Sequence, residues 1–248
     1  MSTSFKAIII GGGPVGLLMA LCLKAANIDF VLLERRDHVV TDKGTDLVIY
    51  PMAMRVFSQL DMLDDFLRVS IPLSIVNRLD HDGNDLGAVE VFDIMKENFG
   101  QVPRFLRRSA LLSFLYGKLG EESHASILTN KNVSSIQEST DGVKVICKDG
   151  QIYSADIVIG ADGAHSNARE EMRRLALASG AVGDDVNDEK PFLTKFRSFV
   201  IAFPRGDLTP GISEETHGHG AGSQLFTDHE MALLGMYTML DEPTRERI

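Results

Sequence analysis

A glycine-rich turn near the start of the chain constrains the fold more than any other feature. Residues 6–10 form a short apolar run, which is typical of a strand buried on both faces of a parallel sheet. The sequence Gly-Gly-Gly-Pro-Val-Gly follows directly at 11–16 and opens a helix-like segment that ends near residue 26, before a second apolar run at 30–33. These segments predict a strand–helix–strand unit, and therefore an α/β protein with a Rossmann-like parallel sheet.

The glycines have the spacing of a dinucleotide-binding loop. Gly11 permits a tight turn, Gly13 lets the backbone approach a pyrophosphate, and Gly16 lets the helix pack closely against the strand. Glu34 ends the next apolar run, where its carboxylate can accept hydrogen bonds from ribose hydroxyls. The pattern predicts a site for the ADP half of a dinucleotide, and by itself it does not separate FAD from NAD.

A second motif lies in residues 155–169, where an apolar strand is followed by Asp162-Gly163, by Ser166 and by Arg169. This pattern closely resembles the Asp-Gly fingerprint of the group A FAD-dependent monooxygenases, flavoproteins with the p-hydroxybenzoate hydroxylase fold. The resemblance implies that the cofactor is FAD and that Asp162 and Gly163 contact it.

Three shorter matches extend this resemblance. Arg108, with the leucines that follow it, is similar to the start of a family helix whose arginine contacts the dinucleotide. Val133 aligns with a position whose backbone meets the adenine. The stretch 31–36, which includes Arg35, is similar to the fungal monooxygenases and epoxidases of meroterpenoid and indole-diterpene biosynthesis. We therefore add Arg108, Val133 and Arg35 to the predicted cofactor-binding residues.

The resemblance also implies an activity. NAD(P)H would reduce the FAD, molecular oxygen would react with the reduced flavin, and one oxygen atom would hydroxylate or epoxidise a small lipophilic intermediate of secondary metabolism, such as a terpenoid. Family members carry a further Gly-Asp motif after the substrate domain, which this sequence lacks, so we expect a C-terminally shortened member. Three explanations stay open: a fragment of a longer monooxygenase, a shortened relative without flavin redox chemistry, and a non-catalytic remnant.

Asp46 is a candidate catalytic residue for the second explanation. The fungal branch usually has Gly-Ala-Ser where this chain has Gly44-Thr45-Asp46, in a loop expected at 44–50 against flavin and substrate. A carboxylate in an apolar pocket has a raised pKa and can act as a general acid or base in an isomerase or cyclase that needs no cofactor. The alternative is an exposed aspartate that caps a turn.

The resemblance and the pattern of turns together predict two discontinuous domains. The FAD-binding domain is expected at 1–70 and 103–178, with a three-stranded antiparallel meander at 133–154. A partial substrate-binding sheet is expected at 71–102 and 179–248, and it includes a hairpin around Asp82-Gly83. Helices are expected at 51–67, 108–119 and 166–178.

Charge and cysteine usage limit the partners. The chain has 25 Lys and Arg against 35 Asp and Glu, a net charge of -10, which disfavours nucleic acid as a partner. We interpret the two cysteines as free thiols of a cytoplasmic protein, or of one peripheral to an internal membrane, and we expect no transmembrane segment. We expect no metal site, and a homo-oligomer that covers the incomplete domain is an open alternative. The acidic and histidine side chains predicted to lie in a solvated loop are Glu214, Glu215, His217, His219 and His229.

Overall fold

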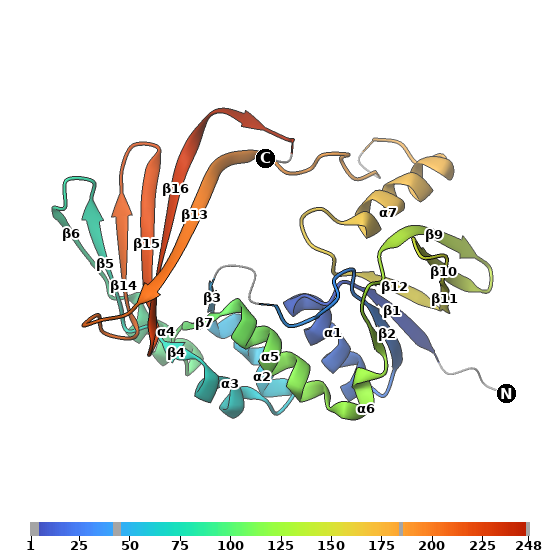
Figure 1. The fold of residues 1–248 in the computed structure, drawn as a ribbon, viewed down its shortest axis with the longest axis horizontal. Coiled ribbons are helices and arrows are strands. Elements are labelled where there is room, and N and C mark those ends of the chain that lie inside the picture. Colours follow the sequence, from blue (N-terminus) through green and yellow to red (C-terminus); the bar gives the residue numbers. More distant parts are fainter. Residues whose placement is uncertain (1–4, 42–45, 184–185, 247–248) are drawn as a thin grey trace. The chain divides into compact units, whose positions relative to one another are not determined.

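Figure 1 shows the computed structural model, which describes residues 5–41, 46–183 and 186–246. Contacts divide the chain into two units, each made of two separate stretches. Unit 1 comprises Met1–Asp42 and Leu111–Phe192, and unit 2 comprises Lys43–Ala110 and Leu193–Ile248. The boundaries of these units differ from the predicted domain boundaries. The assignment of one domain to FAD binding and of the other to substrate binding stays a prediction.

A parallel sheet with the strand order β12-β1-β2-β8 forms the centre of unit 1. Its strands are β12 (Ile157–Gly160), β1 (Lys6–Ile10), β2 (Asp29–Leu33) and β8 (Ile127–Leu128). Helix α1 (Pro14–Ala25) connects β1 to β2, which confirms the predicted strand–helix–strand unit. Residues 7–9 of the central strand β1 are completely buried, as expected for a strand that is covered on both faces.

A three-stranded antiparallel sheet packs on this parallel sheet. It has the order β11-β10-β9 and consists of β9 (Val133–Ser139), β10 (Gly142–Cys147) and β11 (Ile152–Ala155), which confirms the predicted meander. Ile8 of β1 and Leu33 of β2 share one apolar core with Val133 and Val145 of the meander. The two sheets are therefore held together by side chains that come from segments far apart in the sequence.

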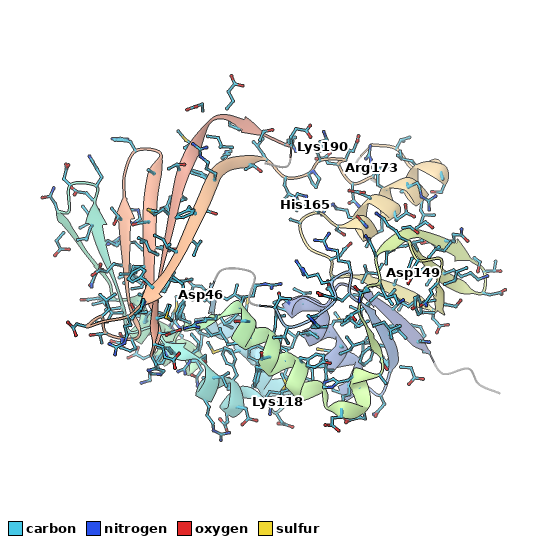
Figure 2. All side chains as sticks on the ribbon, viewed as in Figure 1. Asp46, Lys118, Asp149, His165, Arg173 and Lys190 are labelled. Carbon is cyan, nitrogen blue, oxygen red and sulfur yellow. The ribbon has the colours of Figure 1, made fainter. Side chains whose placement is uncertain are left out.

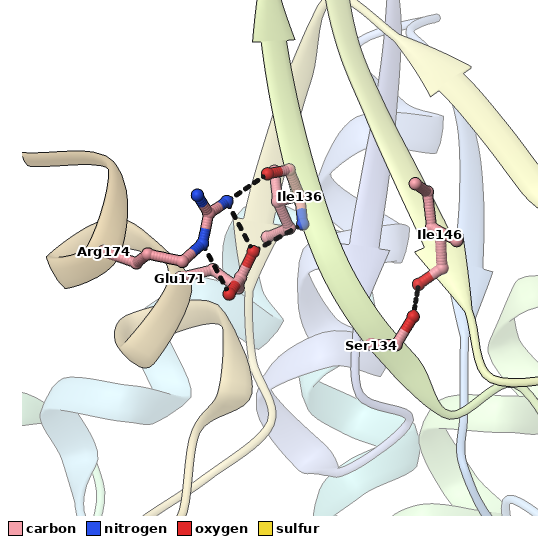
Figure 3. A network of polar contacts seen from close by, with 5 residues as sticks. All are labelled: Ser134, Ile136, Ile146, Glu171 and Arg174. Atoms are coloured by element: carbon pink, nitrogen blue, oxygen red, sulfur yellow. Dashed lines mark hydrogen bonds and ion pairs between the residues drawn. The ribbon is translucent and has the colours of Figure 1, made fainter. Parts of the chain in front are cut away.

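Helix α7 (Asn167–Ala178) binds the outer edge of the meander (Figure 3). β9 is an outer strand of its sheet, so one side of its backbone faces away from β10. At Ile136 the N–H donates to the carboxylate of Glu171 (2.7 Å), and the C=O accepts from the guanidinium of Arg174 (2.8 Å). Glu171 and Arg174 also form an ion pair at 2.9 Å. This pair anchors the helix to the strand and occupies backbone groups that another strand could otherwise bind.

Unit 1 also contains α6 (Glu121–His124) and most of α5, which runs from Arg108 to Leu119 and confirms the helix predicted at 108–119. Four leucines of α5 are buried, at positions 111, 112, 115 and 119. None of the helices in the described part of the chain is both long enough and apolar enough to cross a membrane.

A six-stranded sheet with the order β13-β16-β15-β14-β5-β6 dominates unit 2. β14 and β5 are parallel, and the other neighbouring strands are antiparallel. The strands are β5 (Ile75–Asp80), β6 (Asp85–Val89), β13 (Thr194–Pro204), β14 (Ile212–His217), β15 (Ala221–Thr227) and β16 (Met231–Thr244). The hairpin predicted around Asp82-Gly83 is confirmed, since it joins β5 to β6.

One prediction for this region is wrong. The segment predicted to be a solvated loop with acidic and histidine side chains contains the two strands β14 and β15. Glu214, Glu215 and His217 therefore lie in a strand and not in a flexible loop. The reason is that β14 pairs with β5, more than a hundred residues away, and a neighbour so distant leaves no local pattern in the sequence.

A smaller sheet with the order β3-β7-β4 completes unit 2, and its strands are β3 (Asp46–Ile49), β7 (Arg104–Arg107) and β4 (Ile71–Pro72). The helices of this unit include α2 (Pro51–Gln59), α3 (Leu63–Val69) and α4 (Val91–Phe99). The single helix expected at 51–67 is divided, because Asp61 has a φ of 53°, which a continuous helix does not allow. The loop expected at 44–50 is a strand from Asp46 to Ile49, while Gly44 and Thr45 lie outside the described residues.

We expect the Glu171→Gln variant to be less stable in a pH-dependent way. The hydrogen bond from Arg174 holds the pKa of Glu171 below its ordinary value. The carboxylate therefore stabilises the fold fully at neutral pH, and this contribution is lost as the pH falls through the lowered pKa. Urea unfolding at pH 7 should show a loss on the order of 1 kcal/mol, since a partly exposed charged hydrogen bond is removed.

The control for this prediction is Glu170→Gln, which changes the exposed neighbouring acid on the same helix. Its unfolding free energy should stay close to that of the unmodified chain at every pH. Equal losses in the two variants, or a loss in Glu171→Gln that persists in acid, would contradict the role of the Glu171 carboxylate.

Candidate functional site

The glycine-rich loop of unit 1 approaches the loop after β12 so closely that a side chain at Gly11 has no room. Gly11 follows β1 and has a φ of +107°, a conformation that strongly favours glycine. A Cβ atom at this position would lie 2.5 Å from the carbonyl oxygen of Ala161 and 2.9 Å from the Cα of Asp162. The first and second motifs therefore meet at the carboxyl ends of two neighbouring parallel strands, where open α/β sheets bind their ligands.

The N-terminus of α1 provides donors at the same place. Gly13 is the N-cap residue and has no side chain to satisfy the backbone, and Pro14 is the first helical residue. The N–H groups of the first turn have no partners within the helix, and with the helix dipole they suit a bound anion. Gly16 lies against the loop, because a Cβ atom there would be 1.9 Å from the Gly11 carbonyl oxygen.

Glu34 fastens the end of β2 to the glycine loop. Its side chain is buried, and its two carboxylate oxygens accept hydrogen bonds from the backbone N–H groups of Gly12 (2.6 Å) and Arg36 (2.9 Å). Each carboxylate oxygen can accept more than one hydrogen bond, so the group can still bind a hydroxyl donor. Arg35, between Glu34 and Arg36, is exposed.

Asp162 organises the start of α7. Its carboxylate accepts hydrogen bonds from the Ser166 hydroxyl (2.5 Å) and from the backbone N–H of Ala168 (3.2 Å). The same hydroxyl accepts from the N–H of Arg169 (3.0 Å), which makes Ser166 the N-cap of the helix. Gly163 has a φ of +85° and nothing within 4 Å of its Cβ position. The motif thus forms a rigid turn with an open backbone stretch beside the glycine loop.

The structure places the other predicted cofactor residues as follows. Val133 is buried at the start of β9, and its carbonyl oxygen accepts from the Asn167 side chain (3.1 Å). Arg108 is half-buried at the first position of α5 and belongs by its contacts to unit 2. The structure therefore brings together Gly11, Gly13, Gly16, Glu34, Asp162 and Gly163 within unit 1, and their role in cofactor binding stays a prediction.

Asp46 lies in unit 2, at the start of β3 (Figure 2). It pairs across the small sheet with Arg107 of β7, and its side chain is half-buried. The pKa of Asp46 is raised to about 6, chiefly because burial disfavours the charged form. The positive charge of Arg107 lowers this pKa, and the negative charge of Asp228 raises it. The Oδ2 atom of Asp46 is buried and has no hydrogen-bond partner among the described residues. A raised pKa is what the sequence analysis expects of a carboxylate in an apolar setting, and a half-buried strand position does not fit the exposed turn-capping alternative. The catalytic role of Asp46 stays a prediction.

Sequence reasoning missed the residues around Asp46. Arg107 donates to the Oδ2 atom of Asp228 through two nitrogens, at 2.9 and 2.8 Å. These two residues are 121 positions apart. The pair Arg107-Arg108 could have pointed to this contact, but the sequence analysis assigned a role only to Arg108.

Comparison with known proteins gives a consistent result. A model of the FAD binding domain family matches residues 4–181. The chain is 36% identical to the FAD-dependent monooxygenase srdH of Neurospora crassa over 221 residues, covering 88% of this chain and 49% of that protein. It is 34% identical to the FAD-dependent monooxygenase penE of Penicillium thymicola over 227 residues, covering 91% and 46%. The chain therefore spans about half the length of the curated relatives it matches.

Among solved structures, Klebsiella pneumoniae HpxO in complex with FAD and uric acid has a similar fold. The TM-score is 0.75 at 22% sequence identity, and the match covers 98% of this chain and 58% of HpxO. At this identity the comparison supports the Rossmann-like α/β architecture and says nothing about the ligand of this chain.

We expect Gly16→Ala to destabilise unit 1 strongly. The new methyl group would lie 1.9 Å from the Gly11 carbonyl oxygen, so the helix or the loop has to move. Denaturant unfolding should show a loss of at least about 2 kcal/mol, as for other overpacked buried sites. The control is Gly117→Ala in α5, where nothing lies within 4 Å of the Cβ position. This control should gain up to about 1 kcal/mol, because alanine favours a helix, and similar losses in both variants would contradict the close approach.

Proposed function

This chain belongs to the family of FAD binding domains, and on that premise we propose that it acts as an FAD-dependent monooxygenase on a small lipophilic molecule. The observation that carries the proposal is the meeting of the glycine loop, Glu34 and the Asp162 turn at one edge of the parallel sheet. Its relatives srdH and penE are both named FAD-dependent monooxygenases.

The residues of unit 1 fit an adenine dinucleotide. The positions Gly11 and Gly16 exclude side chains, so the backbone stays open to a large anionic ligand at the N-terminus of α1. In the proposal, Gly11, Gly13 and Gly16 hold the pyrophosphate and Glu34 accepts from the adenosine ribose. The remaining contacts to the dinucleotide within unit 1 are assigned to Arg35, the Val133 backbone, Asp162 and Gly163. Arg108 of unit 2 keeps its predicted role in cofactor binding.

Once bound, FAD would supply the redox chemistry and the oxygen activation, with NAD(P)H as reductant and molecular oxygen as co-substrate. The chain's own contribution is to bind and orient the reactants and to keep water away. Unit 2 supports a lipophilic substrate, because alternate residues of β13 expose apolar side chains on one face: Phe199 is 61% exposed and Ile201 is 42% exposed. A hydroxylated or epoxidised terpenoid-like molecule is the proposed product.

The two other functional hypotheses have less support. An isomerase or cyclase without cofactor would need no dinucleotide loop, yet the loop and its carboxylate have the full geometry described above. A non-catalytic remnant would not need to keep a buried glutamate bound to that loop. Both hypotheses predict no specific flavin binding, so the flavin titration described below tests them as well.

The proposal extends to assembly and location. Ile157 on the outer strand β12 is 45% exposed and Met172 on α7 is 61% exposed, and both line a cavity of about 340 Å³. A second copy of the chain could cover this apolar surface. Light scattering after gel filtration should show a dimer that Met172→Glu converts to a monomer, and a monomeric mass for the unmodified chain would contradict the proposed assembly.

The free thiols Cys22 and Cys147 support a reducing compartment, which agrees with a cytoplasmic location.

Flavin titration tests the cofactor assignment. We expect the chain to bind FAD and Glu34→Ala to weaken that binding at least about tenfold, because a buried carboxylate that holds both loop and ribose is removed. FMN lacks the adenosine, so its affinity should not change. Fluorescence quenching of each flavin measures both effects.

Glu189→Ala, at an exposed acid in unit 1, serves as the matched control and should bind FAD as the unmodified chain does. Circular dichroism shows whether Glu34→Ala is folded. A folded Glu34→Ala variant that binds FAD normally would contradict the assigned role, and a folded chain that binds no FAD would contradict the proposed function.

A further inference from the structure

The carboxylate of Asp228 is completely satisfied by its surroundings. Asp228 follows β15, and its Oδ1 atom accepts hydrogen bonds from the backbone N–H groups of Glu230 (2.7 Å) and Met231 (2.6 Å). Its Oδ2 atom binds the Arg107 guanidinium. Burial raises the pKa of Asp228, but the two backbone donors and Arg107 outweigh that effect, so the net pKa lies below the ordinary value. Asp228 is therefore a fixed negative charge at neutral pH.

Arg107 is consequently directed toward Asp228. Its Nε and one terminal nitrogen both bind the same oxygen of that residue, at 2.9 and 2.8 Å. Asp46 is the residue directly opposite Arg107 in the antiparallel pair of β3 and β7, yet its buried Oδ2 atom has no hydrogen-bond partner in the part of the chain that the structure describes. The cation opposite Asp46 in the sheet is thus ion-paired with another carboxylate.

The apolar surroundings explain the behaviour of Asp46. Val48 and Phe105 continue the same row of the small sheet, because alternate residues of a strand share a face. Phe105 stacks on Phe226, with ring centroids 4.9 Å apart. Each of these two residues lies two positions before one partner of the ion pair between Arg107 and Asp228. The row therefore leads from an apolar core directly to the Asp46 carboxyl group. The apolar side chains lower the local dielectric and so disfavour the charged form of Asp46.

From this geometry we propose that Asp228, by holding Arg107, leaves Asp46 free to serve as a proton donor and acceptor toward a molecule bound in unit 2. The carboxyl group would give its proton to an oxygen of that molecule and take one back from a neighbouring carbon or oxygen, so that no electrons are transferred. The matching ligand chemistry is a lipophilic molecule with a carbonyl or hydroxyl group. Asp228 is the positioning residue of this site.

The electrostatic part can be measured without a ligand, in the complete chain. Carbon NMR of chain labelled at aspartate carboxyl groups should show Asp46, assigned by its loss in Asp46→Asn, titrating near pH 6. In Asp228→Asn, which keeps an acceptor for the turn amides, Arg107 is released toward Asp46 and the titration should move down by about one pH unit or more. In Arg107→Gln it should move up.

The matched control is Asp207→Asn, an exposed acid of unit 2, which should leave the titration of Asp46 unchanged. The opposite shifts in Asp228→Asn and Arg107→Gln keep the test decisive when one of these variants does not fold. An Asp46 that titrates near pH 4 in the unmodified chain, or the same pKa in every folded variant, would overturn the proposal.

A chemical probe tests access to the protonated carboxyl group. Dicyclohexylcarbodiimide is apolar and modifies carboxyl groups that carry a proton, so peptide mapping at pH 6.5 should find Asp46 modified. The modification should fall several-fold in Asp228→Asn and stay the same in Asp207→Asn. A folded chain in which Asp46 is never modified would overturn the role toward a bound molecule, whatever the NMR titration shows.

Discussion

The close contact between the glycine loop and its neighbours is the constraint on which the candidate site of unit 1 depends. Because Gly11 touches the backbone after β12 and Gly16 touches Gly11, the first turn of α1 has only one place to lie. Glu34 then joins the same loop to the end of β2 through the Gly12 N–H. Three parallel strands thereby end at one edge, where the N-terminus of α1 and a buried carboxylate are found.

The two carboxylates of this edge have different tasks. Glu34 binds the glycine loop directly, whereas Asp162 binds the Ser166 hydroxyl and the start of α7. The second motif is therefore first of all a helix cap, and its position beside Gly11 follows from the pairing of β12 with β1. The same helix also binds the outer edge of β9 through Glu171 and Arg174, so the local geometry of the site and the packing of the meander share one element.

Unit 2 shows how tertiary contacts change the chemistry of a residue. Burial raises the pKa of Asp46, the positive charge of Arg107 lowers it, and the negative charge of Asp228 raises it. Arg107 itself binds Asp228, which is also held by two amides of the turn after β15. The adjacent apolar row of Val48, Phe105 and Phe226 adds to the cost of charging Asp46. A strand, a turn and a distant carboxylate thus set the pKa of one side chain.

Elements with local signals could be predicted from the amino-acid sequence. The strand–helix–strand unit, the meander with its Asp-Gly turns and the helix at 108–119 follow from periodicity and from glycine positions. Long-range contacts account for three further features, which are the strand at 46–49, the position of β14 beside β5, and the ion pair of Arg107 with Asp228. The physical reason is that each of these features is stabilised by a partner far along the chain, and such a partner leaves no periodic trace in the residues it stabilises.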